Sequence, residues 1–208
     1  MSLPRIIVLG AGGTGRSIMG SIPSESDAVF LDDNIPIGEI NGRLCVGNLS
    51  KLADEPSASV IVGFGCTYMR QRKDIFEKLK KIMSMTTVIH STAVVDSTAH
   101  IGRGTWLGPH VTVMPNAVVG DNVIVCANAS IDHDCRIEDH VYISPGVHIA
   151  GAAVVCEGAF LGTGANIIPL INIGAWSVIG AGAVVIDSIP ANETFVGVPA
   201  RIISRRSS

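Results

Sequence analysis

The 208-residue chain is poor in aromatic and charged side chains. Aromatic residues make up 4% of it and charged residues 16%, against 47% hydrophobic residues. Aspartate and glutamate (18) outnumber lysine and arginine (15), which gives a formal charge of −3. A nucleic-acid-binding protein normally carries a basic excess, and a disordered chain is more polar. We therefore expect a folded protein that binds no nucleic acid and has a core of small and aliphatic side chains.

The chain also has no run of about 20 apolar residues, the length that a membrane span requires. Its first ten residues lack the basic region and the small-residue cleavage site of a signal peptide. Its five cysteines form no CxxC pair and are odd in number, which favours reduced thiols. These absences predict a cytoplasmic protein without a membrane span.

The second half of the sequence has a six-residue repeat. Every sixth residue from Ile89 to Val185 is Ile, Leu or Val, over 17 consecutive positions. Four residues after each of them the side chain is never charged or aromatic, and eight of the 17 are Ala. A period of six fits neither an α-helix nor simple alternation, but it fits a parallel β-helix with short strands and tight turns. With three hexads per coil, residues 18 apart stack about 4.8 Å apart, over about five to six coils.

Residues 1–86 are interpreted as a separate α/β domain that precedes the β-helix. Strands are expected over 4–10, 28–33 and 59–65, with a short helix from Arg16 and an amphipathic helix over about 69–83 that includes Ile82 in its apolar stripe. Alternating strands and helices favour a parallel sheet. The boundary is expected near residues 84–88, so that 87–208 form the β-helix and a short C-terminal tail.

A glycine-rich loop, GAGGTG at residues 10–15, follows the first expected strand and matches G-x-G-x-x-G. Asp32 and Asp33 stand 17 and 18 residues past Gly15. Such glycines let the backbone approach a phosphate, and the acid accepts hydrogen bonds from ribose. Because the domain is about half the size of a dinucleotide domain, the pattern favours a single nucleotide-phosphate site. The glycines could instead make only a tight strand–helix turn.

Polar side chains interrupt the repeat in one zone, residues 128–142. Gly151 follows His133 by 18 residues, which predicts that the two lie one coil apart on the same face. An imidazole beside a backbone amide suits acyl transfer, because the ring removes a proton and the N–H stabilises the carbonyl oxygen. A carboxylate would fix the tautomer of the ring, and both Asp132 and Asp134 are candidates. Spacing alone leaves open whether His133 is a base or only faces solvent.

Metal binding is the alternative use of histidine. No two of the six histidines are 18 or 36 residues apart, so no column of ligands stacks within one chain. The sequence has neither an H-x4-H nor a CxxC motif. We expect no metal site within one chain, and a site shared between chains stays open. Cys135 falls on a core position of the repeat, where a thiol is shielded and inert.

Several motifs taken together resemble the PglD/NeuD-type bacterial acyltransferases. They are GAGGTGR at 10–16, AVFLDDN at 28–34, NASIDHDCRIEDHVYISPG at 128–146 and FVGVPAR at 195–201. The resemblance covers about residues 4–201. It implies a Rossmann-like nucleotide-binding unit followed by a left-handed parallel β-helix, which assembles as a homotrimer. It also implies transfer of an acetyl group from acetyl-CoA to the 4-amino group of a nucleotide-linked amino-dideoxy sugar. The surface of a single prism is convex, so we expect the site between neighbouring copies.

The same resemblance assigns roles to single residues. His133 corresponds to the general base and Asp134 to the acid that pairs with it. Acetyl-CoA is expected to contact Gly151, Ala181 and Tyr142, and the nucleotide sugar to contact Gly10, Gly12, Gly13, Thr14, Asp32 and Asp33. Tyr142 and Thr14 stand where the family often has histidine. Because tyrosine titrates near ~10 rather than ~6.5, the second ionisable group of the family is in question here.

Three other functions remain compatible with these residues. The first is O-acetylation of a sialic acid or another sugar hydroxyl, which a comparison of amino and hydroxyl acceptors would reveal. The second is a metal-dependent hydrase of the carbonic-anhydrase kind, which bound stoichiometric zinc would favour. The third is a scaffold or nucleotide-sugar sensor, which an absence of acetyl-CoA binding would favour.

Overall fold

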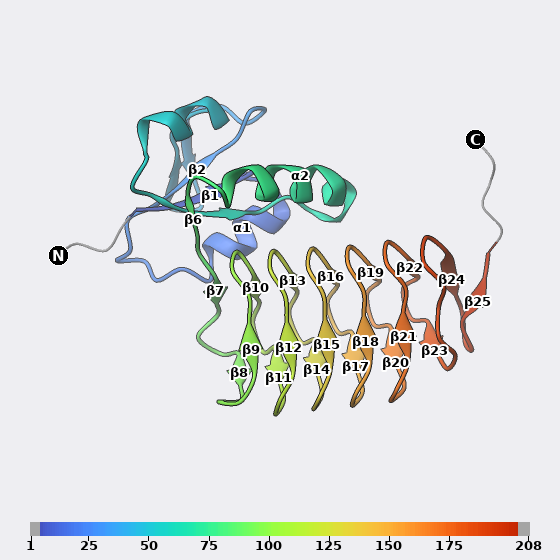
Figure 1. Cartoon of the computed structure of the whole chain (residues 1–208). Coiled ribbons are helices and arrows are strands. Elements are labelled where there is room, and N and C mark those ends of the chain that lie inside the picture. The colour runs from blue at the N-terminus through green and yellow to red at the C-terminus, as the bar shows by residue number, and fades with distance from the viewer. Residues whose placement is uncertain (1–4, 204–208) are drawn as a thin grey trace.

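The computed structural model describes residues 5–203, so the predicted tail beyond residue 203 lies outside the described residues. An α/β unit formed by the N-terminal part of the chain lies at one end of a long prism of short strands (Figure 1). Its helices α1 (Gly13–Met19) and α2 (Met69–Leu79) lie between the N-terminal sheet and the prism. The molecule therefore has one sheet-and-helix layer that covers part of one prism face.

The N-terminal unit is built on a six-stranded sheet in the order β3-β4-β2-β1-β5-β6. The strands are β1 (Ile6–Leu9), β2 (Ala28–Leu31), β3 (Gly38–Ile40), β4 (Arg43–Cys45), β5 (Ser59–Val62) and β6 (Ser84–Met85). Every pairing is parallel except that of β3 with β4. The 3-10 helix η1 (Leu49–Asp54) connects β4 to β5, and a second one, η2 (Cys66–Tyr68), leads from β5 into α2. The three predicted strands are confirmed, each shorter than expected.

The two helices differ from their predicted limits. Helix α1 begins at Gly13, three residues before Arg16, because the Arg16 amide already donates to the carbonyl oxygen of Gly12 (2.9 Å). Helix α2 ends at Leu79, four residues early, since the chain must turn there to enter β6 beside β5. Ile82 is consequently 76% exposed, so its predicted place in the apolar stripe is wrong.

The repeat folds into three parallel sheets, which we call the first, second and third sheets. The first holds β7 (Val88–Ile89), β10 (Trp106–Leu107), β13 (Ile124–Val125), β16 (Tyr142–Ile143), β19 (Phe160–Leu161), β22 (Val178–Ile179) and β24 (Thr194–Val196), with antiparallel β25 (Arg201–Ile202) at its end. The second holds β8 (Val94–Val95), β11 (Thr112–Val113), β14 (Ser130–Ile131), β17 (His148–Ile149), β20 (Asn166–Ile167) and β23 (Val184–Val185). The third holds β9 (His100–Ile101), β12 (Val118–Val119), β15 (Arg136–Ile137), β18 (Val154–Val155) and β21 (Asn172–Ile173).

Stacking at intervals of 18 residues is confirmed along the prism. Ser130 pairs with His148, for example, and Tyr142 pairs with Phe160. From Leu107 to Val185 the aliphatic residues of the repeat are buried, whereas Ile89 is 43% exposed. Ile89 was expected inside the prism, but it lies in the first coil, where no coil stacks beneath it. Three parallel sheets of hexapeptide coils are consistent with the left-handed β-helix that the resemblance implies.

The outer face of the first sheet is apolar and carries the N-terminal unit. Trp106, Ile124 and Tyr142 point outward from this sheet and form one buried cluster with Met19 and Ile22. The aromatic side chains that cannot fit inside the narrow prism therefore lie between the two units. This burial fixes α1 and its preceding glycine loop against the prism.

Arg72 on α2 forms a second connection between the two units. Its side chain is fully buried, and its guanidinium donates hydrogen bonds to the carbonyl oxygens of Asn122 and His140, which lie at the same corner of two successive coils. Burial lowers the pKa of Arg72 to about 10, so the group is still charged at neutral pH. These bonds satisfy corner carbonyls that α2 shields from water.

Candidate functional site

His133 lies at the corner between the second and third sheets, in the turn from β14 to β15. Its Nδ1 is 2.8 Å from Oδ2 of Asp134. The backbone N–H of His133 donates instead to Oδ1 of Asp132 (2.8 Å). The spacing left both carboxylates open as partners of the ring. The structure shows that Asp134 holds the ring and that Asp132 holds the backbone of the turn.

Gly151 lies one coil beyond His133, as the spacing predicts. The backbone N–H of Ala152 donates to the carbonyl oxygen of His133 (2.9 Å), which aligns the two turns. A Cβ atom built on Gly151 would lie 2.6 Å from Nε2 of His133 and 2.7 Å from Cε1. The ring thus lies directly over the Gly151 backbone, and only glycine leaves room for it.

Two neighbouring carboxylates change the pKa of the His133 ring. The hydrogen bond with Asp134 raises the pKa of His133, and the nearby charge of Asp132 raises it further. The pKa of Asp134 is lowered by its hydrogen bonds with His133 and Asn116. An ionised carboxylate only accepts hydrogen bonds, so Nδ1 of the neutral ring carries the proton and Nε2 presents its lone pair. Nε2 is therefore the atom that can take a proton from an attacking group.

The glycine loop has two kinds of glycine. Gly10 has φ +89°, and a Cβ there would lie 2.8 Å from the ring of Phe64. A Cβ on Gly15 would lie 1.8 Å from the carbonyl oxygen of Gly10, so close packing of α1 on β1 requires this glycine. Neither Gly12 nor Gly13 would bring a Cβ within 4 Å of another atom. Packing therefore requires glycine at the ends of the loop, Gly10 and Gly15, whereas Gly12 and Gly13 in its middle border open space.

Asp32 and Asp33 follow β2 beside this loop. Asp32 accepts a hydrogen bond from the Ala11 amide through Oδ2 (2.8 Å), while its Oδ1 accepts from the amides of Asn34 and Ile35. Asp33 accepts from the Leu49 amide through Oδ1 (2.9 Å) and is exposed. Asp32 therefore supports the shape of the loop, and Asp33 is the more accessible carboxylate.

A cavity of about 580 Å³ lies between α1 and the first sheet. Its lining includes Gly13, Thr14, Cys126 and Tyr142, together with residues of the corner between the first and second sheets. The hydroxyl groups of Thr14 and Tyr142 are 3.4 Å apart, and Sγ of Cys126 is 3.6 Å from the Tyr142 hydroxyl. Burial raises the pKa of Tyr142 and raises that of Cys126 to about 11. Both groups are therefore neutral at physiological pH.

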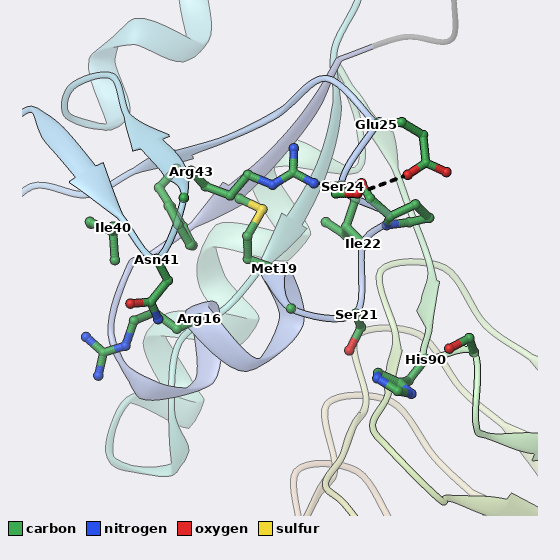
Figure 2. A pocket seen from close by; sticks show the side chains of 15 residues that line it. Arg16, Met19, Ser21, Ile22, Ser24, Glu25, Ile40, Asn41, Arg43 and His90 are labelled. Atoms are coloured by element: carbon green, nitrogen blue, oxygen red, sulfur yellow. Dashed lines mark hydrogen bonds between the residues drawn. The ribbon is translucent and has the colours of Figure 1, made fainter.

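A second cavity, of about 730 Å³, lies at the C-terminal end of α1 and shares Gly20 and His90 with the first cavity (Figure 2). Its labelled lining includes Arg16, Asn41, Arg43 and His90, which come from α1, the β3–β4 hairpin and the first coil. Arg43 donates to carbonyl oxygens of the loop after α1, so its charge already has partners. None of the predicted site residues lines this cavity.

The predicted catalytic residues and the predicted acetyl-CoA contacts Tyr142 and Ala181 fall on different parts of the prism. His133, Asp134 and Gly151 lie at the corner of the second sheet with the third sheet. Ala181 lies at the corner of the second sheet with the first sheet, 36 residues and therefore two coils beyond Pro145 of the 580 Å³ cavity, whereas Tyr142 lies on the first sheet and lines that cavity. A single chain therefore does not bring Tyr142 and Ala181 together with Gly151, although all three were expected to contact acetyl-CoA. Over residues 5–203, no three His, Cys, Asp or Glu side chains are grouped so as to hold a metal ion.

Comparisons with known proteins identify the family. A model of the bacterial transferase hexapeptide (six repeats) matches residues 98–133 and 116–151. The acetyltransferase domain of PglB from Neisseria gonorrhoeae is 32% identical, with 97% of this chain and all of that chain covered and a TM-score of 0.91. The chain belongs to the hexapeptide-repeat acetyltransferases. This finding confirms the family resemblance seen in the sequence.

Two other solved acetyltransferase relatives extend the comparison. This hexapeptide-repeat protein is 28% identical to a mutant of the GDP-perosamine N-acetyl transferase of Caulobacter crescentus, solved in complex with CoA and GDP-perosamine. The comparison covers 98% of this chain and 99% of that chain, with a TM-score of 0.91. It is 28% identical to WeeI from Acinetobacter baumannii, with 97% and 100% covered and a TM-score of 0.87.

Curated serine acetyltransferases match a shorter stretch of the protein. The enzyme of Escherichia coli K12 is 44% identical over 52 residues, which are 25% of this chain and 19% of that enzyme. This match supports the repeat and extends to no other part of the chain. In the part of the chain that the structure describes, no helix has the length and apolar character needed to cross a membrane.

Proposed function

We propose that this protein transfers the acetyl group of acetyl-CoA to the 4-amino group of a nucleotide-linked amino-dideoxy sugar in the cytoplasm. The observation that carries the proposal is the His133 ring, which is oriented by Asp134 and lies over the backbone of Gly151. The relatives of similar fold support it, since one of them binds CoA together with a nucleotide-linked sugar. In this proposal, residues 1–86 form a Rossmann-like nucleotide-binding domain and residues 87–208 form the acyltransferase domain.

The chemistry follows from the basic Nε2 of His133. The neutral amine of the sugar attacks the thioester carbonyl carbon, so that a C–N bond forms and the C–S bond breaks. His133 takes the proton that the amine loses and returns it to the departing thiolate of CoA. A backbone N–H at Gly151 stabilises the developing negative charge on the carbonyl oxygen. Asp134 keeps the ring in the tautomer that this transfer requires.

The division of site residues between different parts of the prism supports a site shared by two copies. One copy supplies His133, Asp134 and Gly151 from one edge of its second sheet. A neighbouring copy supplies Ala181 from the other edge of its second sheet, and Tyr142 from its first sheet, where Tyr142 lines the 580 Å³ cavity. A homotrimer, in which each copy uses both edges, completes three such sites.

The N-terminal unit is proposed to hold the nucleotide. The open backbone at Gly12 and Gly13 leaves room for a phosphate, with Gly10 shaping the loop before them. Asp33, together with Asp32 behind it, accepts hydrogen bonds from the nucleoside. Thr14 and Tyr142 border the cavity that leads from this loop to the prism, where the sugar is expected to lie. The hydroxyl groups of Thr14 and Tyr142 are uncharged, so they are suited to hydrogen-bond with a neutral sugar ring.

A CoA-release assay with a panel of nucleotide-linked amino sugars tests the proposal. We expect turnover with at least one amino sugar and a loss of about 100-fold or more in His133→Ala, because a general base typically contributes that much. His100→Ala is the matched control, since His100 lies in the first coil on the third sheet. Turnover only with hydroxyl acceptors would favour O-acetylation, stoichiometric zinc a hydrase, and an absence of acetyl-CoA binding a scaffold. Near wild-type activity in His133→Ala would reject His133 as the base.

A further inference from the structure

Asp134 has two carboxylate oxygens, and only one of them faces the His133 ring. The other, Oδ1, accepts a hydrogen bond from Nδ2 of Asn116 (3.1 Å). Asn116 precedes Asp134 by 18 residues, so it occupies the same corner one coil earlier. Three successive coils therefore carry a continuous stack, in which Asn116 contacts Asp134, Asp134 contacts His133, and His133 lies over Gly151.

Asn116 is itself held in place from the coil before it. Its backbone N–H donates to Oγ1 of Thr98 (2.9 Å), again 18 residues earlier. The Thr98 hydroxyl donates in turn to Oδ1 of Asp96 (2.7 Å), which also accepts from the Thr98 amide. The backbone of Asn116 is thus held in place by Thr98, which limits the directions in which the side-chain amide of Asn116 can point.

The backbone at position 116 disfavours most side chains, although the same corner of later coils holds Ala152 and Leu170 in the same conformation. Asn116 has φ +59°, a left-handed conformation that glycine and asparagine adopt most readily. Glycine offers no donor to Asp134, and aspartate would place a second negative charge beside it. Asparagine meets both requirements, since it tolerates the conformation and supplies an N–H group.

We propose that Asn116 is a positioning residue for the acetyl transfer, which orients Asp134 so that its other oxygen faces Nδ1 of His133. This inference rests on the proposed function for its effect on catalysis. The carboxylate is more than half exposed, and so is the imidazole. The ring packs against the Gly151 backbone, but the carboxylate is held by hydrogen bonds alone, one to His133 and one from Asn116 in the neighbouring coil. Without the bond from Asn116, Asp134 rotates toward water and the pairing with the ring weakens.

Asn116→Gly tests the inference, because glycine keeps the left-handed backbone and removes only the side-chain donor. The pKa of His133 is measured by NMR titration of the full-length protein labelled with ¹³C at histidine Cε1, with His133→Gln to assign the resonance. We expect the His133 pKa to fall toward its ordinary value, the Asp134 pKa to rise, and kcat/KM on its high-pH plateau to fall about fivefold, the worth of one such hydrogen bond. Asn41→Gly is the control, since Asn41 has φ +49° in the β3–β4 turn and lines only the cavity that holds none of the predicted site residues.

Asn116→Asp separates positioning from backbone shape. Aspartate also adopts the left-handed conformation, so a purely structural role predicts wild-type activity in both variants. Positioning predicts a loss in both, because the introduced carboxylate would repel that of Asp134. An unchanged His133 pKa and an unchanged plateau in Asn116→Gly would overturn the inference.

The titration needs no substrate, so it separates this inference from the proposed function. A shifted pKa in Asn116→Gly, alongside an active His133→Ala, would support the pairing and reject the function. An inactive His133→Ala, alongside an unshifted pKa, would reject only the role of Asn116.

Discussion

Replacing Gly151 by alanine tests the contact on which the catalytic geometry depends. The new Cβ would lie 2.6 Å from Nε2 of His133, whereas ordinary contacts begin at 3.4 Å, so the ring must move by about 0.8 Å. The His133 side chain is 58% exposed and has space to move, so we expect little change in folding stability. A displacement of about 1 Å in a reacting group can cost about 100-fold in rate. We therefore expect kcat/KM for CoA release to fall by roughly that factor.

A second glycine provides the contrast to Gly151. A Cβ on Gly102 would lie 2.4 Å from the backbone of Gly120, which cannot rotate away, at a corner between the third and first sheets. Gly102→Ala should therefore lose about 1–3 kcal/mol of stability through overpacking while the folded enzyme keeps its activity. The assay pairs kcat/KM with the melting temperature of both variants. Activity of Gly151→Ala within twofold of wild type, with the same melting temperature, would refute the reasoning.

Three further outcomes are expected. The kcat/KM should rise with pH, with its midpoint at the raised pKa of His133, because the neutral ring is the active form. Asp134→Asn should shift the midpoint of this pH profile to lower pH, and an unshifted midpoint would contradict the pairing of Asp134 with His133. Arg72→Leu should lower stability in urea denaturation by about 2–4 kcal/mol, since it leaves buried carbonyls of Asn122 and His140 unpaired, and a loss below about 0.5 kcal/mol would contradict this. Burial and the charge of Arg72 lower the pKa of His140, so the unfolded state takes up a proton at a higher pH than the folded state, and folding stability should decline as the pH falls below about 6.5. In thermal melts, His140→Gln should flatten this decline, and an identical decline in the variant would contradict the role of His140.

The sequence by itself determined the prism and the alignment of its coils. A core that holds one aliphatic and one small residue per hexad leaves a period of six in the chain, and stacking of three hexads turns it into a period of 18. That arithmetic placed Gly151 beside His133, and the Cβ distance of 2.6 Å confirms it. The same arithmetic links Asn116 to Asp134, a pair that was not predicted.

A further signal at this period was present in the sequence and was missed. Residues that point outward from the first sheet, 18 apart, are Val88, Trp106, Ile124, Tyr142, Phe160 and Val178. The corresponding series in the second sheet is apolar only at its ends, at Val94 and Val184, and is polar between them at Thr112, Ser130, His148 and Asn166. An apolar outer face on one sheet marks the surface that another part of the protein covers, and here the N-terminal unit covers part of it.

Only the tertiary structure determined which functional groups of the side chains contact one another. Sequence spacing could not distinguish Asp132 from Asp134 as the partner of His133, because the rotation of each side chain depends on local turns and on the coil below. Nor could it show that Thr14 and Tyr142, 128 residues apart, share one cavity. Repeats specify the path of the backbone because every coil obeys the same packing constraint, whereas contacts between unlike units depend on surfaces that come together only in the fold.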